Sequence, residues 1–471
     1  MTFNQWNLDK NLLEAIQKMG YKNPTKVQEK VIPNLLEKKD CLVQSKTGSG
    51  KTASYAIPII NNLKIDERSP QALVLAPTRE LALQIQQDFE NLGTYKKIKA
   101  LAIFGKQPFQ FQKEDLKQRT HVVCGTPGRI LDHLKQGTFL TDKVNTIIID
   151  EADEMLNMDF IEDIQSILTY FKKSCTLAMF SATMPEPIKR FASNILTNPV
   201  YIQLKEERAK LDEHFYKIEE SDKIKALLSY LSQNKYESCL IFANFQARVD
   251  EIYETLLEHK VSVDKIHGGL TQEERLEHMK RFKQGKVRIL VGTDVVSRGI
   301  DVDTIGCVIN FDYPTTKESY IHRIGRSGRM NYIGKAITFV NPNQIEKLNG
   351  LFDYLNIEKF LESLPMYQTY DLSYYEKTMK IRDEKFKNLR KDITKIFVNG
   401  GKNKKLRAGD LVGAICQIDG ITAQDIGVIQ IQDHHSYVDI LNGKGNTVIK
   451  KLSEKTIKGK NIKVSKAKYK K

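Results

Sequence analysis

Cysteine is scarce in this sequence, and long hydrophobic runs are missing. The 471 residues include six cysteines, which lie far apart and form no CxxC pair, so neither a zinc site nor a disulfide framework is indicated. No run approaches the roughly 18 apolar residues that cross a bilayer. The N-terminus also lacks the basic-then-apolar layout of a signal peptide. We therefore expect a cytoplasmic protein with no membrane partner.

Acidic residues are outnumbered by basic ones. The 73 Lys and Arg against 58 Asp and Glu give a formal net charge of +15, which favours a polyanion such as nucleic acid as partner, although charge alone shows only attraction. The length exceeds what one hydrophobic core usually supports. The sequence therefore predicts two or three domains with an affinity for polyanions.

Short apolar segments alternate with segments of helical periodicity along most of the chain. Strands are expected at 41–44, 72–76, 101–104, 121–125, 146–150 and 176–182. These strands are continuously apolar, which indicates a parallel sheet covered by helices on both faces. The pattern resumes near residue 238. We expect an α/β protein with two tandem lobes, 1–204 and 216–363, joined by a charged linker at 205–215.

A glycine-rich stretch follows the first strand. In "SKTGSGKT", Gly50, Lys51 and Thr52 fit the end of a phosphate-binding loop that opens a helix. Backbone amides would face phosphate oxygens, Lys51 would reach the outer phosphates, and Thr52 would bind magnesium. Ser45 stands where the general pattern has glycine. A structural glycine turn is the alternative, which the order of strand, loop, Lys-Thr and helix disfavours.

A second motif, "TIIIDEADEML", consists of an expected buried strand followed by four carboxylates. Asp150 and Glu151 would lie at the carboxyl edge of the same sheet, beside the phosphate loop. Asp150 would hold magnesium, and Glu151 would orient or deprotonate the attacking water. The alternative is an acidic helix N-terminus that favours the helix dipole. Together with the glycine-rich stretch, the acidic cluster predicts a triphosphate hydrolase.

These motifs resemble those of the DEAD-box RNA helicases, whose signature letters stand at residues 150–153. The resemblance extends from Phe3 to about Val340 and also covers "GYKNPTKVQ", "PTRELA", "TPGR", "SAT", "HGGLTQEER", "TDVVSRGID" and "HRIGRSGR". It implies two RecA-like lobes, ATP and Mg²⁺ as cofactors, RNA as partner, and RNA-stimulated ATP hydrolysis. Lys106 departs from the glycine pair common in the family, and Ser327 replaces a common Thr.

The resemblance also implies roles for individual residues. Catalysis is expected of Glu151, Lys51, Arg326 and Arg329, the two arginines acting as fingers when the lobes close. Nucleotide binding is expected of Phe3, Gln28, Thr47, Gly48, Ser49, Gly50, Lys51, Thr52 and Asp301, and metal binding of Thr52 and Asp150. RNA binding is expected of Thr78, Arg79, Thr126, Arg129, Gly268 and Thr293. Coupling of hydrolysis to lobe movement is expected of Ser181, Thr183 and His322.

The end of the chain predicts an RNA-binding module. Residues 364–403 suggest a basic helical extension, and 404–471 a small α+β domain of RNA-recognition type with strands at "LVGAIC", "IGVIQIQ" and "SYVDIL". Tyr437 is its one clear stacking candidate. The Lys-rich end would add phosphate contacts, with a solvated tail as the alternative.

The whole pattern is similar to the DbpA/YxiN branch of the family. That resemblance implies tethering to a 23S ribosomal RNA hairpin and action on large-subunit precursors. We expect a monomer that locally unwinds short RNA duplexes. Two rivals remain: a nucleic-acid clamp with incidental ATPase, and a DNA-directed helicase.

Overall fold

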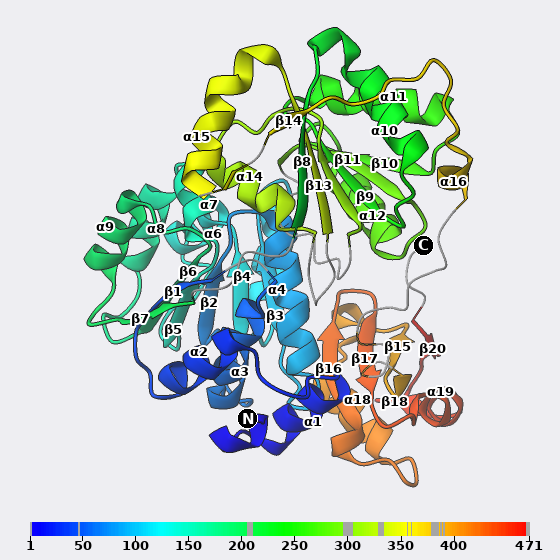
Figure 1. Ribbon diagram of the computed structural model, residues 1–471. Helices are drawn as coiled ribbons and strands as arrows, with labels where there is room; N and C mark the ends of the chain where they lie inside the picture. Colours follow the sequence, from blue (N-terminus) through cyan, green and yellow to red (C-terminus); the bar gives the residue numbers. More distant parts are fainter. Residues whose placement is uncertain are drawn as a thin grey trace.

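The computed structural model describes residues 2–45, 48–204, 211–294, 305–327, 334–355, 357–358, 360–377, 386, 389 and 391–467. They form two parallel-sheet lobes and a smaller C-terminal domain (Figure 1). The predicted fold class is confirmed. No helix in the described part of the chain is long and apolar enough to span a membrane.

The N-terminal lobe contains a seven-stranded parallel sheet in the order β3-β4-β2-β5-β6-β1-β7. Its strands are β1 Cys41–Gln44, β2 Ala72–Leu75, β3 Ala100–Ile103, β4 Val122–Gly125, β5 Thr146–Ile149, β6 Thr176–Ser181 and β7 Val200–Gln203. Its helices are η1 Phe3–Trp6, α1 Lys10–Lys18, α2 Lys26–Leu36, α3 Lys51–Asn62, α4 Arg79–Leu92, α5 Phe109–Leu116, α6 Pro127–Lys135, α7 Ala152–Asn157, α8 Ile161–Leu168 and α9 Glu186–Ile195. Every residue of β2, β4 and β6 is buried, because separate hydrophobic clusters cover the two faces of the sheet.

The C-terminal lobe repeats this architecture in the order β10-β11-β9-β12-β13-β8-β14. Its strands are β8 Leu211–Lys217, β9 Cys239–Phe242, β10 Val263–Ile266, β11 Ile289–Gly292, β12 Cys307–Asn310, β13 Gly334–Val340 and β14 Leu361–Glu362. Its helices are η2 Glu220–Asp222, α10 Lys223–Gln233, α11 Gln246–Glu258, α12 Gln272–Lys283, α14 Lys317–Ile324, η3 Pro342–Gln344, α15 Ile345–Leu355 and α16 Ser373–Glu376. Strand β8 begins inside the expected linker 205–215 and pairs with β13 along its whole length.

The small domain has an antiparallel sheet in the order β16-β17-β15-β20. Its elements are β15 Thr394–Val398, η4 Lys402–Lys404, α18 Ala408–Cys416, η5 Ala423–Asp425, β16 Ile426–Ile431, β17 Ser436–Ile440, α19 Gly445–Ser453, β18 Thr456–Ile457, β19 Lys460–Asn461 and β20 Val464–Lys466. A hydrophobic cluster that includes Ile396, Leu411 and Val438 joins the sheet to its helices.

Two expectations for this domain are wrong. "LVGAIC" lies in helix α18 and is not a strand, because Leu411 and Ile415 are buried one helical turn apart and Asp410 accepts a hydrogen bond from the Arg407 amide at 2.8 Å to cap the helix. The first strand is instead β15, within the segment expected to be an extension. The sheet therefore begins about ten residues before residue 404.

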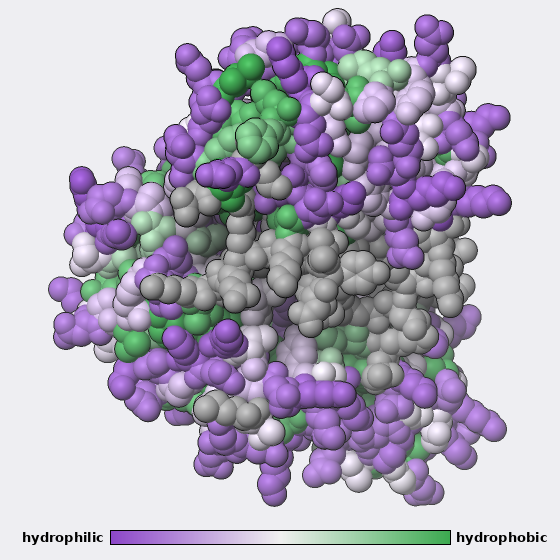
Figure 2. All heavy atoms as spheres, in the orientation of Figure 1, coloured by the Kyte–Doolittle hydropathy of each residue, from purple (hydrophilic) through white to green (hydrophobic). Residues whose placement is uncertain are grey.

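The small domain packs against the N-terminal lobe beside α4 (Figure 1). Leu389 and Leu441 join the hydrophobic cluster of that lobe. Lys97 donates to the Ala423 carbonyl at 2.7 Å, and Lys402 lies 3.8 Å from the Glu114 carboxylate. Figure 2 shows hydrophilic side chains over most of the described part of this face, with a hydrophobic patch near α15.

Candidate functional site

The glycine-rich loop leads into Lys51, whose buried ammonium lies at the carboxyl edge of the N-terminal sheet. Gly50 has φ 93°, and a Cβ there would lie 2.6 Å from Gln28 Nε2, so only glycine fits. Helix α3 begins at the next residue, Lys51, which is only 7 % exposed. Its Nζ has no hydrogen-bond partner among the described residues. A buried ammonium without a partner fits an anionic ligand such as a triphosphate.

The carboxylates after β5 face this cation. Asp150 is buried, and its Oδ2 accepts a hydrogen bond from the Tyr55 hydroxyl at 2.9 Å. Glu151 has φ 54°, an unusual backbone for a residue with a side chain, and its buried Oε2 has no hydrogen-bond partner in the described structure. Burial raises the pKa of both carboxyls, and the nearby charge of Lys51 opposes the shift.

A magnesium ion bound to a nucleotide fits these residues. Carboxylate and hydroxyl oxygens, which Asp150 and Thr52 supply, are the ligands that Mg²⁺ prefers. The described residues hold no cluster of three or more His, Cys, Asp or Glu that could bind a metal unaided. Asp150 and Thr52 are the residues that would hold Mg²⁺ here.

The predicted adenine-reading residues lie around the same loop. Gln28 is buried, accepts from the Thr25 amide at 3.0 Å and donates to the Gly50 carbonyl at 3.3 Å. Phe3 is also buried and stacks on Tyr21 with ring centroids 6.5 Å apart. The structure therefore joins Gln28 directly to the phosphate loop, and adenine recognition by Gln28 and Phe3 stays a prediction.

The predicted coupling residues form a chain of contacts between the lobes. Thr183 donates to Asp153 Oδ2 from its amide and its hydroxyl, both at 2.9 Å, and Ser181 donates to the Thr183 carbonyl at 2.6 Å. From the other lobe, His322 Nε2 lies 3.7 Å from Asp153 Oδ2, and its Nδ1 hydrogen-bonds to Glu154. His322 thus touches the acidic motif of the opposite lobe.

The charges at this junction are mutually dependent. Burial lowers the pKa of His322, but the hydrogen bond to Glu154 and the charge of Asp153 outweigh it and raise the pKa. Burial raises the pKa of Asp153, but His322 and Lys51 outweigh it and lower the pKa. Arg326 is buried one turn after His322, and its charge opposes the rise that burial causes in the pKa of Glu151.

The predicted RNA-binding residues lie at the carboxyl ends of strands in both lobes. In the N-terminal lobe, Thr78 and Thr126 are the residues immediately before α4 and α6, each followed closely by its arginine. In the C-terminal lobe, Gly268 follows β10 and Thr293 follows β11. These residues therefore occupy corresponding edges of the two sheets, as a strand of RNA held by both lobes would require.

Cations gather at this edge. The pKa of the Arg79 guanidinium is lowered, first by burial and then by the like charges of Arg275 and Arg129. The lobes also meet here, because the side chains of Arg275 and Glu80 form a buried ion pair at 2.8 Å and Gln272 donates to Glu80 at 3.1 Å. Because Arg275 is paired with Glu80, the positive charge of Arg79 and Arg129 is left to attract a phosphate backbone.

The sheet of the small domain carries an aromatic group that the sequence reading missed. Phe397 of β15 pairs with Tyr437 of β17, and their ring centroids are 5.7 Å apart. His435 lies 5.3 Å from Phe397 and 5.2 Å from Tyr437. The prediction of an extension at 364–403 leaves Phe397 out of the RNA-binding domain, although the alternation in "TKIFV" indicates a strand there.

Three of the predicted nucleotide-site residues cannot be placed, and two others lie in the glycine-rich loop. Thr47, Asp301 and Arg329 lie outside the described residues. Gly48 has φ 77°, and the Ser49 hydroxyl lies 3.2 Å from that of Ser45, so both belong to the phosphate loop.

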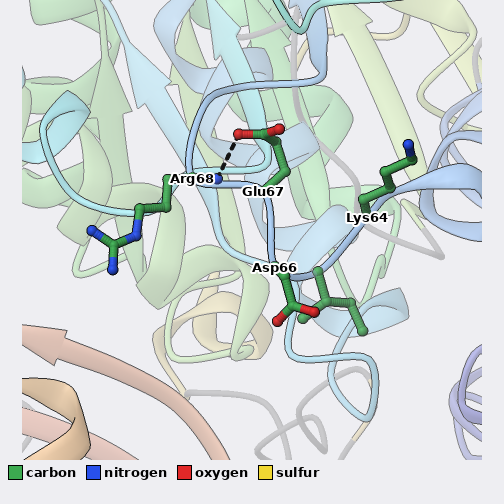
Figure 3. A pocket seen from close by; sticks show the side chains of 5 residues that line it. Lys64, Asp66, Glu67 and Arg68 are labelled. Atoms are coloured by element: carbon green, nitrogen blue, oxygen red, sulfur yellow. Dashed lines mark hydrogen bonds between the residues drawn. The ribbon is translucent and has the colours of Figure 1, made fainter.

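A surface hollow lies at residues 64–68 (Figure 3), where Glu67 accepts from the Arg68 amide at 2.9 Å. The hollow lies just after the C-terminal end of α3. Lys51 is at the N-terminal end of that helix, roughly 18 Å away along the helix axis. The hollow therefore does not belong to the loop site.

Comparison with known proteins gives matches along most of the chain. Residues 25–191 match the DEAD/DEAH box helicase family, 222–331 the helicase conserved C-terminal domain, and 395–466 the DbpA RNA binding domain. The last match begins close to β15, in agreement with the earlier start of the small domain.

Relatives found by comparison of whole sequences agree with these family matches. The ATP-dependent RNA helicase DbpA of Bacillus subtilis (strain 168) is 44 % identical over 474 residues, covering 99 % of each chain. The DEAD-box ATP-dependent RNA helicase CshA of Geobacillus kaustophilus (strain HTA426) is 40 % identical over 353 residues, covering 74 % of this chain and 76 % of CshA.

Solved structures show the same two-lobe arrangement. Dbp5 of S. cerevisiae bound to RNA and ADP BeF3 has a TM-score of 0.70 at 30 % identity, covering 76 % of this chain and 94 % of Dbp5. The DEAD-box helicase Mss116 bound to ssRNA and UDP-BeF has a TM-score of 0.72 at 28 % identity, covering 78 % of this chain and 80 % of that one. The chain belongs to the DEAD-box ATP-dependent RNA helicases, of the DbpA type with an RNA-binding C-terminal domain.

Proposed function

We propose that this helicase locally separates short RNA duplexes while its C-terminal domain is tethered to 23S ribosomal RNA, and that it acts in assembly of the large ribosomal subunit. The observation that carries the proposal is the junction at which His322 and Arg326 of one lobe reach the acidic motif of the other. This junction supports the proposal because the residues predicted to hydrolyse ATP meet between the same two lobes whose edges carry the predicted RNA-binding residues.

In this proposal hydrolysis depends on buried charges. Lys51 binds and neutralises the outer phosphates, and Glu151 takes the proton of the attacking water; its Oε2, which has no hydrogen-bond partner among the described residues, is available for that proton. Asp150 and Thr52 would hold Mg²⁺, which would neutralise charge on the phosphates. Arg326, together with Arg329, stabilises charge on the transferring phosphate.

RNA binding and hydrolysis are linked through lobe closure. RNA that contacts Thr78, Arg79, Thr126 and Arg129 on one lobe and Gly268 and Thr293 on the other favours the closed arrangement. Closure brings His322 to Asp153, which holds Thr183 of the coupling motif. Loss of the terminal phosphate weakens the junction and releases one strand of the duplex.

The C-terminal domain supplies the tether. Its match to the DbpA RNA binding domain supports RNA as ligand, and the rings of Phe397 and Tyr437 offer stacking surfaces on one face of the sheet. The resemblance to the DbpA/YxiN branch is the basis for naming a 23S hairpin as that RNA. We further propose that the protein acts as a monomer in the cytoplasm.

A strand-separation assay tests the proposal. A short labelled RNA duplex joined to a 23S fragment that contains the peptidyl-transferase hairpin is incubated with the full chain, with and without ATP, beside a DNA duplex of the same sequence. We expect separation of the RNA duplex only with ATP, and much less of the DNA duplex. An ATP-independent rate would favour a passive clamp, and equal DNA unwinding would favour a DNA helicase.

A further inference from the structure

A buried glutamine of α5 connects two segments of the proposed RNA-binding edge. Gln112 is 2 % exposed. Its amide nitrogen donates to the Phe104 carbonyl at 2.8 Å and to Gln107 Oε1 at 3.1 Å. Its amide oxygen accepts from Arg129 Nη1 at 3.1 Å and contacts His133 Nε2 at 3.2 Å. All four hydrogen-bonding positions of one amide are thereby used.

The orientation of this amide is fixed by its neighbours. Burial, followed by the charge of Arg129, lowers the pKa of His133 to about 4, so the ring is neutral at pH 7. Arg129 can only donate and the Phe104 carbonyl can only accept, so the Gln112 oxygen faces Arg129 and the amide does not flip. His133 Nε2 then donates to the same oxygen, which leaves Nδ1 unprotonated at 2.7 Å from the Thr138 hydroxyl.

Arg129 is held by several groups at once. Besides Gln112, its Nη1 donates to the Gln107 carbonyl at 2.8 Å. Its Nε lies 3.5 Å from the Asp132 carboxylate, and its guanidinium lies over the Phe109 ring at 5.9 Å. A guanidinium oriented before its ligand arrives loses less conformational freedom when it binds a phosphate.

The loop at 104–108 is held by the same amide at Phe104 and Gln107. Its exposed Lys106 has φ 61°, an uncommon conformation for a residue other than glycine. Without Gln112 the Phe104 carbonyl would lose its side-chain donor, and the hydrogen bond from Arg129 to the Gln107 carbonyl would have to hold the loop to α6 by itself.

We propose that Gln112 is a positioning residue for RNA binding, which holds Arg129 and the 104–108 loop in the geometry that receives the RNA backbone. Gln112 does not touch the RNA itself. The inference rests on the proposed RNA-binding role of Arg129, so the test treats the two residues separately.

The test uses Gln112→Met, which keeps side-chain length but removes all four hydrogen bonds. Gln110→Met on the same helix is the matched control, because Gln110 is exposed and its amide contacts only Glu114 among the described residues. ATP hydrolysis is titrated with single-stranded RNA. We expect the half-saturating RNA concentration to rise about 10-fold in Q112M, with a smaller change in rate at saturating RNA, and to be unchanged in Q110M.

A double-mutant cycle with Arg129→Ala separates positioning from general destabilisation. If Gln112 acts through Arg129, Q112M adds little further loss of RNA affinity in the R129A background, although its effect on thermal stability persists. Full additivity of the two losses of RNA affinity would overturn the inference. An R129A variant with normal RNA dependence would instead overturn the proposed role of Arg129.

Gln112→Glu provides a second variant in case Q112M folds poorly. It keeps an acceptor for Arg129 but loses both amide donors. The positioning role predicts an RNA half-saturation for Q112E closer to wild type than to Q112M. Equal defects in Q112E and Q112M would show that the contact with Arg129 does not matter.

Discussion

Two residues of the proposed catalytic site are buried although each keeps a polar atom without a hydrogen bond among the described residues. Lys51 Nζ and Glu151 Oε2 have no partner among the described residues, and leaving such groups buried is costly unless a ligand completes them. We interpret this cost as the preparation of the site for a nucleotide and the attacking water. These residues were predicted from sequence because phosphate chemistry confines them to short contiguous motifs.

Glu151→Gln tests the assignment of the base. The substitution keeps size and removes the proton acceptor, so we expect ATP turnover at saturating RNA to fall about 100-fold or more while nucleotide binding persists. Turnover is measured by phosphate release and binding with a fluorescent nucleotide. Glu162→Gln, at an exposed position of α8, serves as control; a Glu151→Gln enzyme that kept a tenth of its turnover would contradict the assignment.

His133 makes stability depend on pH. Its pKa is about 4 in the folded protein and 6.5 in the unfolded chain, so between these values the unfolded chain binds the proton and the folded protein does not. The free energy of unfolding is therefore unaffected by this ring above about pH 6.5 and decreases as the pH falls toward 4. Urea unfolding across this range should show a steeper loss of stability for wild type than for His133→Gln; parallel pH profiles would contradict the buried neutral ring.

At the scale of elements, the parallel strands were predictable and the small domain was only partly so. Continuous apolar runs such as "TIIID" fit a strand covered on both faces, and β5 lies there. "LVGAIC" is equally apolar, but its helix is decided by the cap at Arg407 and the burial of Leu411 and Ile415, which depend on tertiary packing. The hydrogen bonds of Gln112 could not be predicted from sequence, since its partners come from separate segments of the chain.

The aromatic pair on β15 and β17 predicts an RNA contact of the small domain. Phe397→Ala and Tyr437→Ala should each weaken binding of the target RNA by about 10-fold, because stacking on one base contributes about 1–3 kcal/mol. Binding is measured by fluorescence anisotropy, with thermal unfolding as a check on folding. Phe360→Ala, which removes a ring 80 % exposed outside the small domain, is the control; unchanged affinity in both sheet variants would exclude this face.

At the scale of the whole molecule, the proposed function depends on two lobes meeting in one arrangement. Contacts between distant parts of the chain, such as those of His322 with Asp153 and of Arg275 with Glu80, define that arrangement. The sequence supplied the motifs but not these pairings, because they exist only after both lobes have folded and closed.

A charge exchange tests the closed arrangement. Glu80→Arg or Arg275→Glu alone leaves a buried charge unpaired, so each should reduce RNA-stimulated ATP hydrolysis about 10-fold or more, and the double variant should recover much of the loss. Arg248→Glu, which alters the half-buried ion pairs of Arg248 with Glu220 and Glu251 within one lobe, is the control and should have a smaller effect on RNA stimulation. A double variant no better than the singles would contradict closure through this pair.

Steady-state ATP hydrolysis by the full chain tests the central claim most directly. Half-saturating concentrations are compared for an RNA that contains the peptidyl-transferase hairpin of 23S ribosomal RNA and for an unrelated RNA of equal length. A helicase tethered by its C-terminal domain predicts a much lower value for the ribosomal RNA, with similar maximal rates. Equal values for the two RNAs would contradict site-directed tethering and leave a helicase with a general RNA anchor.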